Sequence, residues 1–198
     1  MKLNIIVVGV GGQGALTTAA IIARAAMKAG LNVITAETHG MAQRGGSVDV
    51  HVRIGDVKAP TIPIGSADVM IALEPSESLR YSKFLNENSV VILNDKPIIP
   101  PTVSVGVSGY PSLEEILENL RKITQRIYVV NASDIAEEIG STRVTNVVVI
   151  GILLKLLNLP FKYEHVEEAL RDLMSGDILE LNLKALKAGF KSVQPSVV

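Results

Sequence analysis

The sequence predicts an α/β protein with three layers, α/β/α, in which a mostly parallel sheet lies between two sets of helices. Two patterns predict this class. Short apolar runs alternate with helical segments up to residue 140, and after residue 140 the patterns are helical up to a short tail. Hydrophobic residues make up 47% of the chain and charged residues 20%, so the chain has enough apolar material for a core and disorder is not expected.

The first elements form a strand–turn–helix–strand unit. Residues 3–8 are a continuous apolar run that ends at Gly9, typical of a strand buried on both faces of a parallel sheet. Residues 13–29 have helical character and many alanines, which let a helix lie close to a sheet, and Gly30 fits the position just after its last turn. Residues 32–36 read as the second strand, so we expect a right-handed crossover.

An edge hairpin is predicted next. Between residues 48 and 54, valine and isoleucine alternate with polar residues, which predicts a strand with one solvated face. Gly55 and Asp56 are suited to turn the chain back, and Pro60 and Pro63 would restrict the returning strand to the edge of the sheet.

The remaining elements of the sheet follow in alternation. Apolar runs predict further strands at residues 68–73, 90–93 and 127–130. One helix is expected at residues 76–85. Ser112 and Glu115 form a capping-box pair that predicts the start of a second helix. A third is expected at residues 133–139, where Gly140 ends the helix. Residues 97–111 contain four prolines and are expected to be mostly extended loop.

Three helices complete the prediction. Residues 145–157 are apolar on nearly all sides, which indicates a buried helix, whereas residues 163–174 are amphipathic. A last helix is expected at residues 181–188, followed by a loose tail at residues 194–198. We therefore expect one domain over residues 1–198, with an α/β core at 1–140 and C-terminal helices at 141–198.

Composition excludes several classes of function. The chain has 19 basic and 20 acidic residues, a net charge of −1, which argues against a nucleic-acid partner. No apolar stretch is long enough to span a membrane and the N-terminus does not resemble a signal peptide, so a cytoplasmic protein is expected. Cysteine is absent, so this chain cannot form disulfides or ligate an iron–sulfur cluster, and its three scattered histidines do not predict a metal site.

The segment between the first strand and the first helix is rich in glycine. It matches G-x-G-x-x-G at Gly9, Gly11 and Gly14, with Gly12 and Gln13 between them. Glycines allow a tight turn, and a helix N-terminus presents free N–H groups to an anion or a nucleotide. The alternative is that these glycines only permit close packing of strand and helix, and the motif leaves both open.

An acidic residue after the second strand would complete a dinucleotide site. Glu37 stands near the position from which a carboxylate binds a ribose hydroxyl in Rossmann-like folds. With the glycine loop, it supports a module that binds NAD or FAD.

The segment 37–48 is dense in functional residue types. His39 can titrate near neutrality and Arg44 can bind a phosphate or carboxylate through two hydrogen bonds, so both are candidate catalytic residues. Glycines let the backbone bend and approach a ligand or another chain. The other members of this candidate interface or substrate loop are Gly40, Met41, Gln43, Gly45 and Gly46. The alternative is an irregular loop whose polar groups satisfy its own backbone.

These two segments together resemble a known family. Gly-Val-Gly-Gly-Gln-Gly at 9–14 and Glu-Thr-His-Gly-Met-Ala-Gln-Arg-Gly-Gly at 37–46 are similar to the γ subunits, or γ domains, of 2-oxoacid:ferredoxin oxidoreductases. The His-Gly-Met-Ala-Gln stretch resembles the indolepyruvate branch, whereas pyruvate and 2-oxoglutarate relatives usually carry a Gly-Pro-Glu type of stretch before the arginine. The resemblance covers nearly the whole chain in length and element order, and it is specific over residues 9–14 and 37–48.

The resemblance implies a role in a larger enzyme. In this family, a complex decarboxylates a 2-oxoacid on thiamine diphosphate, passes electrons through [4Fe–4S] clusters to ferredoxin, and releases an acyl-CoA; the indolepyruvate branch converts aryl pyruvates to arylacetyl-CoA. Thiamine diphosphate, Mg²⁺ and the clusters would lie in a large α subunit. The present chain would be the small subunit, with CoA possible at the shared site and segment 37–48 facing the partner.

Two other functions remain open at this point. One is a stand-alone Rossmann-type oxidoreductase that binds NAD or FAD, although Arg-Gly-Gly shortly after the ribose carboxylate is not a requirement of a simple dinucleotide fold. The other is a non-catalytic scaffold subunit that only anchors partners.

Overall fold

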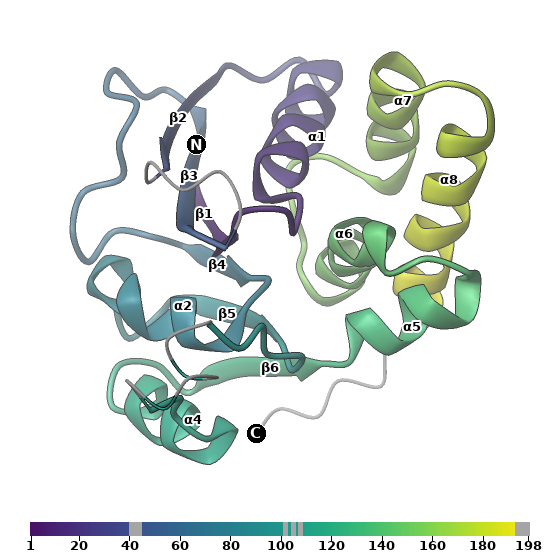
Figure 1. Cartoon of the computed structure of the whole chain (residues 1–198). Helices are drawn as coiled ribbons and strands as arrows, with labels where there is room; N and C mark the ends of the chain where they lie inside the picture. The colour runs from purple at the N-terminus through teal and green to yellow at the C-terminus, as the bar shows by residue number, and fades with distance from the viewer. Residues whose placement is uncertain (40–44, 101–102, 104–105, 107–108, 193–198) are drawn as a thin grey trace.

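The computed structural model describes residues 1–39, 45–100, 103, 106 and 109–192 of the chain. Its centre is a six-stranded mixed sheet with the strand order β2-β3-β1-β4-β5-β6 (Figure 1). The strands are β1 (Lys2–Val10), β2 (Val33–His39), β3 (Ser47–Gly55), β4 (Val69–Ala72), β5 (Val90–Asn94) and β6 (Arg126–Val130). β1, β4, β5 and β6 pair in parallel, and β3 is antiparallel to both of its neighbours.

Helices cover both faces of this sheet, so the predicted α/β/α class is confirmed. The described residues form α1 (Ala15–Lys28), α2 (Pro75–Arg80), α4 (Leu113–Arg121), α5 (Ala132–Ile139), α6 (Thr145–Leu156), α7 (Tyr163–Leu173) and α8 (Gly176–Lys191), with 3₁₀ turns η1 (Ser82–Phe84) and η2 (Thr142–Val144). One apolar core joins α1 and α5–α8 to one face, and a second joins α2, η1 and α4 to the other (Figure 1).

Local sequence signals account for most of these elements. β1, β4 and β5 are the expected apolar runs, and their residues are buried on both faces over nearly their whole length. Ser112 and Glu115 form the predicted capping box at the start of α4. The helix predicted at residues 76–85 is instead α2 followed by η1, and the last helix begins earlier than predicted, at Gly176.

The predicted edge hairpin has a different partner strand. Residues 57–66 are all described and form no strand; the antiparallel partners of β3 are β2 and β1. The prediction of a solvated face on β3 is also wrong, because Asp49, His51 and Arg53 are all buried. The coil after β3 covers this face and supplies hydrogen-bond partners: Arg53 donates to the carbonyl groups of Ala59 and Thr61.

The insertion of β3 also changes the first crossover. β2 runs in the same direction as β1, as expected for a strand–helix–strand unit, but β3 lies between the two strands. The strand register shows that Glu37 is separated from β1 by a whole strand. Glu37 on β2 pairs with Val50 on β3, and Val50 pairs with Val7 on β1.

The C-terminal helices pack through close backbone contacts. α6 is buried on nearly all sides, as its apolar sequence predicts. It meets α8 at Gly151 and Gly189. A Cβ atom on Gly189 would lie 2.1 Å from the carbonyl oxygen of Val148, and one on Gly151 would lie 2.3 Å from that of Leu186. The two helices approach this closely because neither glycine has a side chain.

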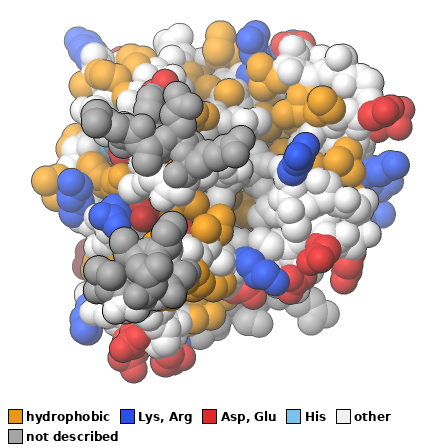
Figure 2. All heavy atoms as spheres, in the orientation of Figure 1, with side chains coloured by type: hydrophobic (Ala, Val, Ile, Leu, Met, Phe, Trp, Pro, Cys, Tyr) orange, Lys and Arg blue, Asp and Glu red, His pale blue; other side chains and the backbone are white. Residues whose placement is uncertain are grey.

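Charges and apolar side chains are mixed on the surface. Figure 2 shows Lys, Arg, Asp and Glu side chains scattered over the face in view, in keeping with a net charge of −1. Within the part of the chain that the structure describes, no helix combines the length and apolar character that crossing a membrane requires.

Gly189→Ala is expected to destabilise the chain, although the same change in an exposed helix stabilises by about 1 kcal/mol. The new methyl group would overlap the backbone of α6, and overpacking of this kind costs about 1–3 kcal/mol. Lys187→Ala, an exposed position of the same helix, serves as the control and should change stability by less than ~0.5 kcal/mol. Urea unfolding of the three proteins tests this, and a more stable Gly189→Ala variant would contradict the packing described.

Candidate functional site at the carboxyl edge of the sheet

The parallel strands end at one edge of the sheet, and the helices that follow them pack on opposite faces of the sheet. α1 follows β1 and packs on one face, whereas α2 follows β4 and packs on the other. The point between β1 and β4 is therefore a topological switch point. Folds of this class bind ligands in the crevice at this point, outside the carboxyl ends of the strands.

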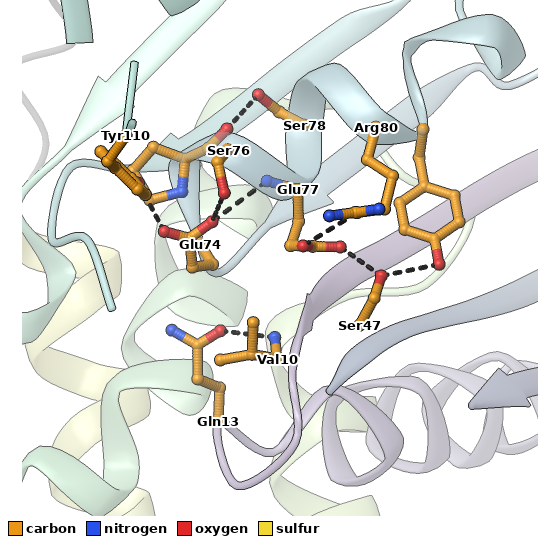
Figure 3. Close-up of polar contacts among 11 residues, drawn as sticks. Val10, Gln13, Ser47, Glu74, Ser76, Glu77, Ser78, Arg80 and Tyr110 are labelled. Atoms are coloured by element: carbon orange, nitrogen blue, oxygen red, sulfur yellow. Dashed lines mark hydrogen bonds and ion pairs between the residues drawn. The ribbon is translucent and has the colours of Figure 1, made fainter. Parts of the chain in front are cut away.

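The glycine loop is tied to both strands by Gln13. Its side-chain oxygen accepts from the backbone N–H of Val10 at 2.9 Å (Figure 3). Its side-chain nitrogen donates to the carbonyl of Leu73 at 2.9 Å. A Cβ atom on Gly9 would lie 2.8 Å from the Gln13 side-chain oxygen and 3.2 Å from Cβ of Leu73. Gly9 therefore serves the packing of the loop.

Gly14 and Gly12 differ in what surrounds them. Gly14 has a φ of 80° as the N-cap of α1, and a Cβ there would lie 3.0 Å from the side-chain nitrogen of Asn146 on α6. Gly12 has a φ of 103°, is exposed, and has open space where a side chain would be. Gly14 thus serves packing, while Gly12 leaves the backbone open to an approaching ligand.

The two glycine segments meet. The backbone N–H of Gly11 donates to the carbonyl of Gly46 at 2.8 Å, and that of Gly45 donates to the carbonyl of Gly11 at 3.2 Å. The end of the 37–48 segment is therefore held against the glycine loop by a reciprocal pair of hydrogen bonds. The sequence singled out the two segments as separate candidates, and these contacts bring their glycines together.

A first cavity of about 420 Å³ opens beside the glycine loop. Gly11, Gly12 and Gln13 line it, together with basic side chains from two other segments, Lys96 after β5 and Arg143 in η2. Acidic groups lie nearby, because Glu137 lines the cavity and Asp134 accepts from Lys96 at 3.2 Å. The N-terminus of α1 adds partial positive charge, so this corner is suited to an anionic group.

A second cavity, of about 500 Å³, lies on the other side of Ile98, which lines both. Its described lining includes Ser47, Ser76, Arg80 and Tyr110. Its wall therefore combines hydroxyl groups, apolar side chains such as Ile98, and the charged side chains of Arg80 and Glu77.

The buried carboxylate of Glu74 holds two residues of the second cavity, Ser76 and Tyr110, in place. It lies two residues after β4, is 1% exposed, and accepts hydrogen bonds from Tyr110 (2.5 Å), Ser76 (2.7 Å) and the backbone N–H of Glu77 (3.1 Å) (Figure 3). It also accepts from the backbone N–H of Ile98 at 3.3 Å. Burial, and then the hydrogen bond to Glu74, raises the pKa of the Tyr110 hydroxyl, which therefore remains a donor. The buried carboxylate so anchors the segment after β5 to the start of α2.

The candidate residues of the 37–48 segment divide into two groups. Glu37 is exposed on the edge strand β2, two strands away from β1, so the structure does not bring it to the glycine loop as a dinucleotide fold would. His39 ends β2. The side chain of His39 and the candidates Gly40, Met41, Gln43 and Arg44 lie outside the described residues.

Four charged residues that line the cavities were not predicted from the sequence, namely Glu77, Arg80, Lys96 and Arg143, and neither was the buried Glu74 that binds two lining residues. One signal was available, because Leu73-Glu74-Pro75 places a carboxylate between a buried strand and a proline suited to the first helical position. The described residues contain no group of three or more His, Asp or Glu side chains that could hold a metal ion.

Comparison with known proteins agrees with this fold. Residues 4–192 match the family described as pyruvate ferredoxin/flavodoxin oxidoreductase. The chain is 66% identical, over the full length of both proteins, to indolepyruvate oxidoreductase subunit IorB of Archaeoglobus fulgidus. It is 33% identical to the pyruvate/ketoisovalerate oxidoreductases common subunit gamma of Pyrococcus abyssi, with 94% of each chain covered.

Solved structures show the same architecture. The gamma subunit of keto/oxoacid ferredoxin oxidoreductase from Geobacter sulfurreducens superposes with a TM-score of 0.70 at 25% identity, covering 96% of each chain. The 2-oxoglutarate:ferredoxin oxidoreductase from Magnetococcus marinus gives a TM-score of 0.74 at 24% identity; it covers 98% of this chain but only 32% of its own, which shows the shared fold.

Fold, glycine loop and full-length similarity define this protein as a subunit of an oxidoreductase of the oxoacid class. The chain belongs to the pyruvate ferredoxin/flavodoxin oxidoreductase family.

NAD(H), NADP(H) and FAD are expected to bind the isolated chain with Kd values above ~100 μM, despite the G-x-G-x-x-G spacing. The reason is geometric: β3 separates Glu37 from the glycine loop, so no ribose contact forms there. Calorimetric titration with each dinucleotide, with an NAD-dependent dehydrogenase as positive control, measures this. Low-micromolar binding would favour a stand-alone Rossmann-type oxidoreductase.

Proposed function

We propose that this chain is the small subunit of a thiamine diphosphate-dependent 2-oxoacid:ferredoxin oxidoreductase in the cytoplasm. The proposed reaction is the oxidative decarboxylation of indolepyruvate and other aryl pyruvates to arylacetyl-CoA, with reduction of ferredoxin. The observation that carries the proposal is the 66% identity, over the full length of both chains, to an indolepyruvate oxidoreductase subunit.

The composition of the chain supports this division of labour. It has no cysteine, so the [4Fe–4S] clusters of such a complex would be ligated by the partner, a large α subunit. We assign thiamine diphosphate and Mg²⁺ to that subunit as well. When bound, thiamine diphosphate supplies the stabilisation of the carbanion that decarboxylation leaves.

The first cavity supports a contribution of this chain to coenzyme A binding. Its glycine loop leaves the backbone of Gly12 accessible, and Lys96 and Arg143 supply positive charge beside the N-terminus of α1. The phosphate groups of coenzyme A match this chemistry. The acidic side chain of Glu137, which also lines this cavity, would disfavour the binding of other anions and so add selectivity.

The 37–48 segment supports the assignment of the interface. Its end is held to the glycine loop through Gly45, Gly46 and Gly11, and Gly11 lines the first cavity while Gly45 lines the second. We propose that this segment faces the partner subunit, with His39 and Arg44 in contact with the substrate, the thiamine-bound species or coenzyme A.

The isolated chain is expected to be colourless and inactive, and to gain indolepyruvate-dependent viologen reduction only when its partner is added. The partner is the protein captured from native extract by the tagged chain. Visible absorbance, iron and thiamine analysis, and turnover of the chain alone and of the complex give the comparison. Turnover by the chain alone would overturn the subunit assignment.

Arg44→Ala is expected to lower turnover of the reconstituted complex by about one to three orders of magnitude, or to prevent assembly. Truncating a desolvated guanidinium paired with a carboxylate or phosphate costs roughly 2–5 kcal/mol, partly because its partner is left unpaired. Arg44→Lys should restore activity incompletely, because the planar fork is lost.

The control for Arg44 is Arg24→Ala. Arg24 is partly exposed on α1, 3.8 Å from Asp172, and such a surface pair contributes little. Turnover and subunit association are measured for all three variants. An Arg44→Ala complex that assembles and turns over like wild type would show that residues 37–48 are not part of the active interface.

A further inference from the structure

Ser47 clamps the last turn of α2 to the start of β3. Its hydroxyl forms hydrogen bonds with the carboxylate of Glu77 and, at 2.9 Å, with the hydroxyl of Tyr81 (Figure 3). Glu77 and Tyr81 lie four residues apart, so both project from the same side of this helical turn. The side chain of Glu77 is only 5% exposed, so its carboxylate is held inside the protein.

A second layer of buried polar groups supports this clamp. The Tyr81 hydroxyl also interacts with the carboxylate of Asp49, which lies 2.9 Å from Nε2 of His51. Nδ1 of His51 accepts from the backbone N–H of Ile62 at 3.1 Å, which assigns the ring proton to Nε2. Burial raises the pKa of the Tyr81 hydroxyl. The clamp therefore rests on groups that each have a hydrogen-bond partner within the protein.

Arg80 is the exposed end of this network. Its Nε donates to Glu77 at 3.1 Å, while the arginine side chain is 63% exposed and lines the second cavity (Figure 3). Within the part of the chain that the structure describes, only this one of its five N–H groups has an assigned hydrogen bond. The remaining donors form the planar fork that suits carboxylate and phosphate groups.

The two partners of the Arg80–Glu77 pair differ in burial, which distinguishes this pair from an ordinary surface ion pair. Arg121 and Glu114 on α4 illustrate the ordinary case: the carboxylate is 70% exposed, and the pair needs no further support. In the Arg80–Glu77 pair the carboxylate is buried and fixed by Ser47, and the guanidinium is the accessible member. A carboxylate fixed in this way orients the arginine by its Nε and leaves the terminal nitrogens to a ligand.

We propose that Arg80 is an anion-binding residue of the second cavity and that Glu77 is its positioning residue. The ligand class is a small molecule with a carboxylate or phosphate group, and the hydroxyls of Ser76 and Tyr110 in the same lining offer further hydrogen bonds. Within the proposed function, on which the choice of ligand rests, the two sources of such a group are the 2-oxoacid and coenzyme A.

The first experiment uses the full isolated chain and does not depend on the proposed function. Pyrophosphate and acetate are titrated in turn at constant ionic strength while the side-chain N–H resonance of Arg80 is followed by NMR. We expect a saturable shift for Arg80 and none for Arg121, whose partner Glu114 is an exposed carboxylate. Equal, non-saturating shifts at both arginines would overturn the proposal.

The second experiment uses the reconstituted complex with Arg80→Gln, Arg80→Lys and the control Arg121→Gln. We expect Arg80→Gln to raise the KM of one substrate by about 10- to 100-fold, the usual effect of losing a hydrogen bond to a charged group, with little change in kcat. Arg80→Lys should recover this only in part. A raised KM for coenzyme A identifies a phosphate, and a raised KM for the 2-oxoacid identifies its carboxylate.

Two further variants separate binding from folding. Arg80→Gln leaves the buried Glu77 carboxylate unpaired, so Arg80→Gln/Glu77→Gln removes both charges and should recover thermal stability without recovering KM. Glu77→Gln alone should raise the same KM, but by a smaller factor than Arg80→Gln does. The reason is that the Arg80 guanidinium remains present but is less firmly positioned. If recovered stability brings back a normal KM, the network is structural and the proposal is wrong.

The remaining outcomes are also decisive. If folded Arg80 variants no longer associate with the partner, Arg80 pairs with an acidic group of that subunit and the small-anion proposal is overturned. If the wild-type complex has no 2-oxoacid activity but pyrophosphate or acetate still saturates Arg80, the proposed function fails while the anion site stands.

Discussion

The carboxyl edge of the sheet depends on one backbone group, the carbonyl of Leu73, the residue that follows β4. Gln13, from the loop after β1, donates to it at 2.9 Å, and Asn94, at the end of β5, donates to it at 3.3 Å. Two amide side chains thus join the ends of three parallel strands where regular pairing stops. Because Gln13 also accepts from Val10, the same bonds fix the glycine loop that both cavities border.

The antiparallel strand β3 has the largest consequences for function. It separates Glu37 from the glycine loop, which removes the geometry of a dinucleotide site, and it brings Ser47 to the carboxyl edge beside α2. Its polar face is expensive to bury unless every group is paired. In the part of the chain that the structure describes, no buried side-chain nitrogen or oxygen lacks a hydrogen-bond partner, so this requirement is met.

The C-terminal helices do more than cover the sheet. Asn146, near the start of α6, donates to the carbonyl of Gly14 at 3.4 Å, which links α6 to the N-cap of α1. η2, just before α6, carries Arg143 to the first cavity. The close approach of α6 and α8 through Gly151 and Gly189 holds this helix in place, so packing far from the cavity sets the position of one of its cations.

The sequence by itself determined the elements whose signals are local. Apolar runs marked β1, β4 and β5, and the Ser112–Glu115 pair marked the start of α4. Tertiary structure decided the burial of β3, because a period of two reports alternating polarity but not whether a later coil will cover the polar face and pair with it. It also brought Lys96 and Arg143 together in the first cavity and placed Arg80 in the second, although the three residues come from separate segments of the chain.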